Sequence, residues 1–296
     1  MSSQPEADAQ SHIYYVPHKS FWPIVAAGGL FMFLAGAANW LNGNYLVGKT
    51  VLAIGAFVIF AMFMGWFGRV ISESLKGTFN AQVDTSFRLG MVWFIMSEIF
   101  FFAAFFGALF YVRTFVVPWL GGLGDKGAVT NGFIWPGFSA AWPTNGPEAV
   151  GGPFTATSPW GIPLINTLLL LSSSATVTVA HHALRAGNRK RLMGFLGITV
   201  LLGIAFLLAQ AHEYWESWYH LNMTLQSGIY GGTFYILTGF HGLHVTVGTI
   251  ALIVIWLRCA RGHFDRDHHF AFEGVAWYWH FVDVVWLNLF LFVYIL

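Results

Sequence analysis

Glu98 is the residue whose chemistry is least expected for its position, because it lies inside the apolar run FRLGMVWFIMSEIFFFAAFFGALF. It follows Arg88 by about 15 Å along a helix, which places it near the middle of a membrane. A carboxylate at that depth is costly unless it is protonated or paired. Two roles stay open for Glu98: a proton-handling group, or a protonated acid that joins helices by hydrogen bonding.

Two histidines in the segment TGFHGLHVTVGT are candidate partners of Glu98. Counting back from Arg258 puts His244 about 21 Å and His241 about 25 Å from the inner membrane boundary, so His244 is the better match in depth. The two histidines lie three residues apart on one helical face, so a metal or haem site is the competing interpretation. Such a site would need further ligands from other helices.

The last segment, HHFAFEGVAWYWHFVDVVWLNLFLFVYIL, carries His280 and Asp283 at membrane depth. They are three residues apart on one helix, so we expect the imidazole and the carboxyl group to satisfy each other. A histidine ligand oriented by a neighbouring aspartate would give the same pattern.

Adjacent histidines occur at two inner boundaries, His181 with His182 and His268 with His269. Neighbouring side chains on a helix point in different directions, so each pair is a poor chelate. We expect solvated or headgroup-facing histidines, with a surface zinc site as the alternative, and therefore assign no metal to this chain.

Acids at the outer end of the fifth apolar run lie in AQAHEYWESW, which contains His212, Glu213 and Glu216 beside Trp215 and Trp218. This composition is typical of an aromatic belt, with the acids in water.

Two arginine groups are candidates for lipid headgroup binding. Arg258 and Arg261 lie one turn apart where the sixth run ends, and Arg69 lies near Trp66 at the inner end of the second. Anionic phospholipid is the natural partner of such a patch, although basic side chains that only anchor a helix would look the same.

The composition is that of an integral membrane protein, since 56% of the chain is hydrophobic and only 9% is charged. The near-zero net charge argues against nucleic acid as a partner. The single cysteine, Cys259, excludes an intramolecular disulfide and a thiolate metal cluster. Residues 1–20 are polar, so we expect the first apolar run to be an uncleaved span.

Windows of about 20 apolar residues predict an all-α polytopic membrane protein with seven transmembrane helices. They begin near Phe21, Thr50, Phe87, Gly161, Leu192, Ile229 and Glu273. We divide the chain into a cytoplasmic tail at 1–20, a two-helix hairpin at 21–68 and a five-helix bundle at 87–296. An external loop at 118–160, rich in Gly, Pro, Trp and Thr, cannot span.

The distribution of bases predicts the orientation of these helices. If the seven helices alternate in direction across the membrane, three bases fall on one side of it, namely Lys49, Arg113 and Lys126. All other bases fall on the opposite side. The positive-inside rule therefore puts the N-terminus in the cytoplasm, or its organellar equivalent, and the C-terminus on the opposite face.

Four motifs together resemble subunit III of the haem-copper cytochrome c oxidases. They are SEIFFF around Glu98, TGFHGLHV at 238–245, HHFAFE at 268–273 and AWYWHFVDVVW at 276–286. The resemblance extends from Trp22 to the last helix. It implies that helices 1–2 are separated from helices 3–7 by a V-shaped, lipid-filled cleft.

The resemblance also implies an accessory, non-redox subunit of an aa3-type oxidase that takes electrons from cytochrome c. Haem and copper would lie in subunits I and II, the chain would pack against subunit I, and His280 and Asp283 would be polar packing. Glu98 matches the family's carbodiimide-reactive glutamate, which is implicated in proton uptake. We group His244 and His241 with it as proton-related residues, because of their depth.

For lipid binding, the resemblance assigns Arg258 to a headgroup position and Arg261 to a second base. The family often has a base before the glutamate that ends helix 2, but this chain has Ser72 before Glu73. Arg69, one turn earlier, could replace that base beside Trp66.

Other functions remain as alternatives at this point. Subunit III of a quinol oxidase, or a nitric oxide reductase accessory subunit, is the nearest, although such relatives tend to have fewer helices. A haem protein ligated through His241, His244 or His280 and a proton-coupled transporter are more distant. The long loop at 118–160 favours a bacterial inner membrane over a mitochondrial one.

Overall fold

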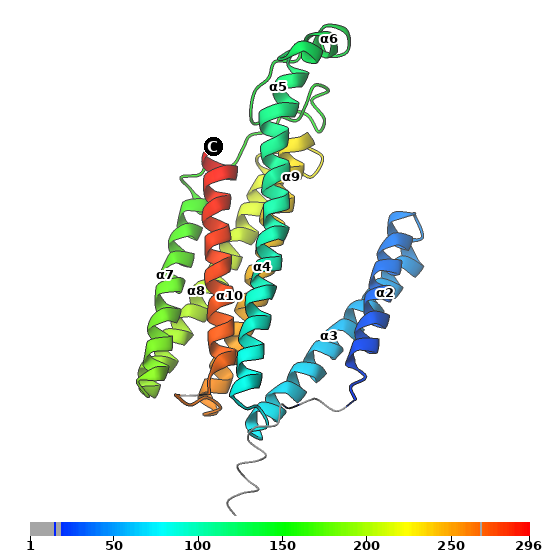
Figure 1. The fold of residues 1–296 in the computed structure, drawn as a ribbon. Helices are drawn as coiled ribbons and strands as arrows, with labels where there is room; N and C mark the ends of the chain where they lie inside the picture. Colours follow the sequence, from blue (N-terminus) through cyan, green and yellow to red (C-terminus); the bar gives the residue numbers. More distant parts are fainter. Residues whose placement is uncertain (1–14, 16–18, 267) are drawn as a thin grey trace, which may run out of the picture. The chain divides into compact units, whose positions relative to one another are not determined.

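The computed structural model describes residue 15, residues 19–266 and residues 268–296, so the predicted tail at 1–20 lies almost wholly outside the described residues. Within the described part the chain is helical and has seven helices long and apolar enough to cross a membrane, which confirms the predicted fold class (Figure 1). These are α2 (Trp22–Leu41), α3 (Tyr45–Leu75), α4 (Ala81–Tyr111), α7 (Ile162–Arg185), α8 (Arg189–Tyr219), α9 (Gly228–Ala260) and α10 (Phe270–Leu289).

Two of these helices continue through π-helical turns. The π-helix η1 (Val112–Val116) and α5 (Val117–Leu120) extend α4, and the π-helix η2 (Phe290–Ile295) extends α10 to the end of the chain. Several helices start earlier than their apolar windows predict; α4 and α8, for example, begin with polar residues that are also helical. The chain divides into two compact units, Met1–Phe87 and Arg88–Leu296. The V-shaped cleft between helices 1–2 and the rest stays a prediction.

The first unit is built on the hairpin of α2 and α3, which pack closely against each other. Gly36 on α2 faces the backbone of Leu52, and Gly48 on α3 faces the backbone of Trp40, with no room at either glycine for a Cβ atom. Small residues let helix backbones approach in this way in membranes, where lipid is as apolar as the side chains.

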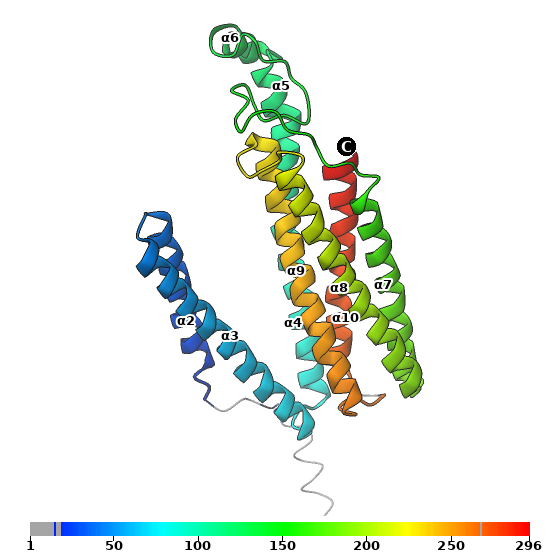
Figure 2. The same cartoon turned by 180° about the vertical axis from the view of Figure 1, so that it is seen from behind.

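The second unit is centred on α10, which packs against α7 and α9, while α8 packs against the same two helices (Figures 1 and 2). Trp279 and Trp286 of α10 are fully buried. Their indole nitrogens donate to Ser173 Oγ at 2.8 Å and Thr167 Oγ1 at 2.9 Å, both on α7. Such bonds satisfy donors that would otherwise be unpaired in an apolar interior and fix the depth of α10 against α7.

The external segment contains a further short helix, α6 (Asp125–Phe133), and both views show α5 and α6 beyond the ends of the other helices of this unit (Figures 1 and 2). Asn131 on α6 donates to the backbone oxygens of Leu120, Trp135 and Phe138, each at 3.0 Å. Further along, Thr155 N donates to Leu221 O at 3.0 Å, which ties the segment to the end of α8.

Candidate functional site

Glu98 on α4 and His244 on α9 are in contact, as their depths predict. His244 Nε2 lies 2.9 Å from Glu98 Oε2, and His244 Nδ1 lies 2.6 Å from Phe240 O. A backbone oxygen can only accept, so Nδ1 carries a proton. The Nε2 to Oε2 bond then needs one more proton, which comes either from a carboxylic acid or from an imidazolium.

Aromatic side chains surround this pair. The rings of Phe101 and Phe102 lie 6.0 and 5.0 Å from the His244 ring, and Tyr278 OH donates to His244 O at 3.2 Å. The Glu98 and His244 side chains keep 20% and 13% of their surface exposed. The pair is therefore held in an apolar setting at the edge of the bundle, where a hydrogen bond is strong and an unpaired charge is costly.

His241 lies on the same helix but in a different environment. It is buried, its Nε2 lies 3.2 Å from Val282 O, and its ring lies 5.2 Å from that of Trp286. The structure thus brings Glu98 together with His244 and not with His241.

His280 and Asp283 do not satisfy each other, so that prediction is wrong. His280 Nδ1 lies 2.5 Å from Ser174 Oγ and its Nε2 lies 3.4 Å from Thr178 Oγ1, both on α7. Asp283 is buried, and neither of its carboxyl oxygens has a hydrogen-bond partner among the described residues. Cross-helix bonds from His280 to α7 replace the local one.

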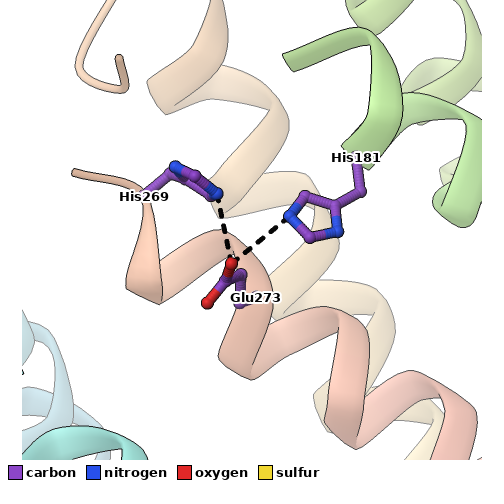
Figure 3. A group of neighbouring side chains, drawn as sticks. All are labelled: His181, His269 and Glu273. Atoms are coloured by element: carbon purple, nitrogen blue, oxygen red, sulfur yellow. Dashed lines mark ion pairs between the residues drawn. The ribbon is translucent and has the colours of Figure 1, made fainter. Parts of the chain in front are cut away.

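The C-terminal end of α7 and the N-terminal end of α10 bring together a group that the sequence does not reveal, shown in Figure 3. Glu273 Oε1 lies 3.5 Å from His181 Nε2 and 3.2 Å from His269 Nε2, and its Oε2 pairs with Arg88. His269 is 7% exposed and His181 is half-buried. The prediction that both histidine pairs are solvated is therefore wrong for these two members, whereas the His268 side chain is 83% exposed.

These three side chains are a possible metal donor set. One atom each of His181, His269 and Glu273 lie within 4.8 Å of one another. Two imidazoles and a carboxylate are ligands that Zn²⁺ uses, with a fourth position left for water. Arg88 pairs with the other oxygen of the same carboxylate, while His181 Nε2 and both ring nitrogens of His269 have no hydrogen-bond partner among the described residues. The histidines are adjacent in sequence as His181 with His182 and His268 with His269, whereas the cluster contains one histidine from each pair.

The outer acids differ from each other. Glu213 is fully buried and accepts a hydrogen bond from Tyr294 OH at 2.7 Å, so the prediction that it lies in water is wrong. Glu216, one turn later, is half-buried. Gln210, Glu213 and Ser217 share one face of α8, and all three are buried, which is the signal that the local composition hides.

The residues proposed for lipid binding lie near the C-terminal ends of α3 and α9. Arg258 is 7% exposed, and its guanidinium lies 4.3 Å from the Phe264 ring centroid. Arg261 is exposed.

In the first unit, Arg69 Nε pairs with Glu73 Oε1 at 3.0 Å, and Trp66 is 43% exposed. The Arg69 pair supplies the charge compensation that Ser72 does not.

Comparisons with known proteins point to one family over nearly the whole chain. The family model described as cytochrome c oxidase subunit III matches residues 12–125 and 131–296. The chain is 40% identical to the protein named cytochrome c oxidase subunit 3 from Latimeria chalumnae, over 96% of this chain and 97% of that protein. It is 38% identical to the proteins of the same name from Equus asinus and Danio rerio, with the same coverage.

Proposed function

The chain belongs to the cytochrome c oxidase subunit III family, and from this premise we propose that it is the accessory, non-redox subunit III of an aa3-type cytochrome c oxidase. That complex reduces oxygen with electrons from cytochrome c and pumps protons. The observation that carries the proposal is the match to relatives over 96% of the chain. A quinol oxidase or nitric oxide reductase subunit is not favoured, because the relatives reported above are all named as cytochrome c oxidase subunits.

Haem and copper are assigned to the partner subunits I and II. The histidines at membrane depth support this assignment, since His241, His244 and His280 bond to three different parts of the bundle. They do not converge on one point as haem or copper ligands would.

Glu98 and His244 are assigned to proton uptake by the complex. Their bond holds an exchangeable proton between a carboxyl group and an imidazole. A pair of this kind, next to the proton entrance of subunit I, would keep that surface in a well-packed environment of low dielectric constant and sustain proton delivery.

The test is Glu98→Ala in the complete complex, with the exposed acid Glu148→Gln as the control. We expect slower proton uptake and faster loss of activity during turnover for Glu98→Ala alone. Unchanged uptake and an unchanged active lifetime would remove Glu98 from the proposal and leave the structural role of the chain intact.

The contact with subunit I is assigned to the face shared by α7 and α10. Ser174, Thr178 and His280 reach this face, and His280 lies about 15 Å along α10 from Phe270, near the membrane midplane. Polar groups at that depth usually contact another helix rather than lipid.

Crosslinking tests this face, since the single native cysteine, Cys259, is buried. A cysteine introduced by Thr178→Cys should crosslink to subunit I. One introduced by Leu208→Cys, at a position on α8 that is 67% exposed, should not. Crosslinking from α8 alone would place the contact elsewhere.

Anionic phospholipid is proposed to bind at Arg258 and Arg261 and near Arg69, Glu73 and Trp66. The positions of these side chains at inner helix ends fit headgroup contact. Arg261→Leu should reduce the amount of phospholipid that copurifies with the complex, as measured by mass spectrometry. Equal lipid in the variant and the parent would count against this site.

The protein is a multi-span membrane subunit. We propose a bacterial inner membrane, with the N-terminus on the base-rich cytoplasmic side. Because the relatives reported above come from vertebrates, the mitochondrial inner membrane stays the alternative.

A further inference from the structure

A second buried polar group lies in the outer half of the five-helix unit, separate from Glu98 and His244. It consists of Asn166 on α7, Gln210 and Glu213 on α8, and Tyr294 on η2. All four are at least nine-tenths buried, with exposed fractions of 0, 5, 0 and 7%.

Hydrogen bonds connect the members of this group across three elements. Tyr294 OH donates to Glu213 Oε1 at 2.7 Å, and Asn166 Nδ2 donates to Gln210 Oε1 at 3.3 Å. Gln210 also lies beside Tyr294. The π-helical turn at the end of α10 carries Tyr294, and such turns are frequent at functional sites.

Three polar atoms of the group have no hydrogen-bond partner among the described residues. They are Asn166 Oδ1, Gln210 Nε2 and Glu213 Oε2. An amide donor, an amide acceptor and a carboxyl oxygen of one hydrogen-bonded group are thus left without a partner. A ligand that satisfies all three atoms must both donate and accept hydrogen bonds. A metal ion cannot accept a bond from the amide N–H group, and an anion cannot donate one to the carboxyl oxygen. Water meets all three requirements, and buried water typically bonds to such groups.

We infer that Asn166, Gln210, Glu213 and Tyr294 form a buried water-binding site, in which Glu213 is a neutral carboxylic acid that exchanges its proton with solvent through that water. The acid is neutral because it is buried, accepts a hydrogen bond from the neutral Tyr294 OH, and has the like-charged acid Glu216 as a neighbour. A carboxylate left unpaired there would be costly.

The site lies close to the outer end of the bundle, which gives its proton a short route to solvent. Glu213 precedes Tyr219, the last residue of α8, by six residues, or about 9 Å. Ser217 lies on the same face one turn beyond Glu213, and its Oγ is 3.1 Å from Thr157 Oγ1 of the external segment. This hydroxyl pair can carry the proton onward, because each hydroxyl both donates and accepts hydrogen bonds.

Infrared spectroscopy of the complex purified through this chain tests the inference. The wild type should show a carboxylic acid carbonyl band that shifts in D₂O, and Glu213→Gln should lose that band. Glu216→Gln, a matched change one turn away on the same helix, should keep it. Tyr294→Phe should keep the band but move it to higher frequency, since the hydrogen bond to Oε1 is lost.

Three results would overturn the inference. If Glu213→Gln leaves the acid region unchanged, Glu213 is ionised. If the band is insensitive to D₂O, water does not reach the acid. A density map of the complex that shows a metal ion between these side chains would also contradict it. Should Glu213→Gln fail to assemble, the band position in Tyr294→Phe decides, because an unshifted band is incompatible with the site.

Discussion

Replacing both members of the Glu98 and His244 pair by leucine should destabilise the protein by less than the sum of the two single replacements. The bond of 2.9 Å joins two partly buried side chains in an aromatic setting. A neutral acid that donates to Nε2 fits that setting better than an ion pair, because desolvation of two charges can exceed their attraction.

The size of the coupling follows from this assignment. Double-mutant cycles of hydrogen bonds in a membrane protein average about 0.6 kcal/mol and reach about 1.7 kcal/mol. Each single leucine leaves one polar atom unsatisfied, at a cost of about 1–3 kcal/mol, whereas the double leucine leaves neither. We therefore expect a coupling free energy of about 1–2 kcal/mol between Glu98 and His244.

The assay is the free energy of unfolding of the four variants in detergent micelles, measured by denaturant titration. Glu98→Gln serves as the matched control, since its amide N–H can replace the acid as the donor to His244 Nε2 and should preserve most of the stability. A coupling indistinguishable from zero would mean that the two side chains do not interact. A coupling above about 3 kcal/mol, or a Gln variant as unstable as the Leu variant, would indicate an ion pair instead.

Three further outcomes follow from the structure. Zn²⁺ added to the complex should bind at least about tenfold more weakly after His181→Ala than after His182→Ala, as measured by calorimetry; equal affinities would exclude His181, His269 and Glu273 as the site. Gly36→Ala should cost about 1–3 kcal/mol in the free energy of unfolding, and Gly28→Ala, which has open space around it, should cost far less; similar losses would refute the close packing of α2 on α3. Trp279→Phe should cost about 1–3 kcal/mol through its lost hydrogen bond and the space it leaves, and an unchanged unfolding free energy would show that the indole bond is not a stabilising contact.

The seven helices could be predicted because lipid imposes a strong constraint, namely that a spanning segment must be apolar, long and internally hydrogen-bonded. Helix ends are not constrained in this way. α4 starts at Ala81, in a polar stretch that hydropathy does not select, and continues to Leu120 through a π-helical turn. The packing of α2 on α3 depends on which glycines face each other, which no window average contains.

Some contacts of the site residues could likewise be predicted from the sequence, and others could not. The contact between Glu98 and His244 could be predicted because depth in a membrane can be counted along a helix. The environment of Glu213 could not be judged from the tryptophans beside it, since the rest of the bundle decides which face of α8 is covered.

His181 and His269 come together only because α7 and α10 end at the same level, 88 residues apart in the sequence. Neighbours along the chain gave the wrong pairs there, because contacts between helices bring together residues that are distant in sequence.

The central claim is that this chain is a subunit of the oxidase and carries no redox centre itself. It is tested most directly by a reduced-minus-oxidised spectrum of the complex purified through a tag on this chain, repeated after detergent has removed the chain. The account predicts that the haem signal and oxygen uptake stay with the remaining subunits and that activity then decays during turnover. Haem that leaves with this chain would contradict it and make His241, His244 and His280 ligand candidates.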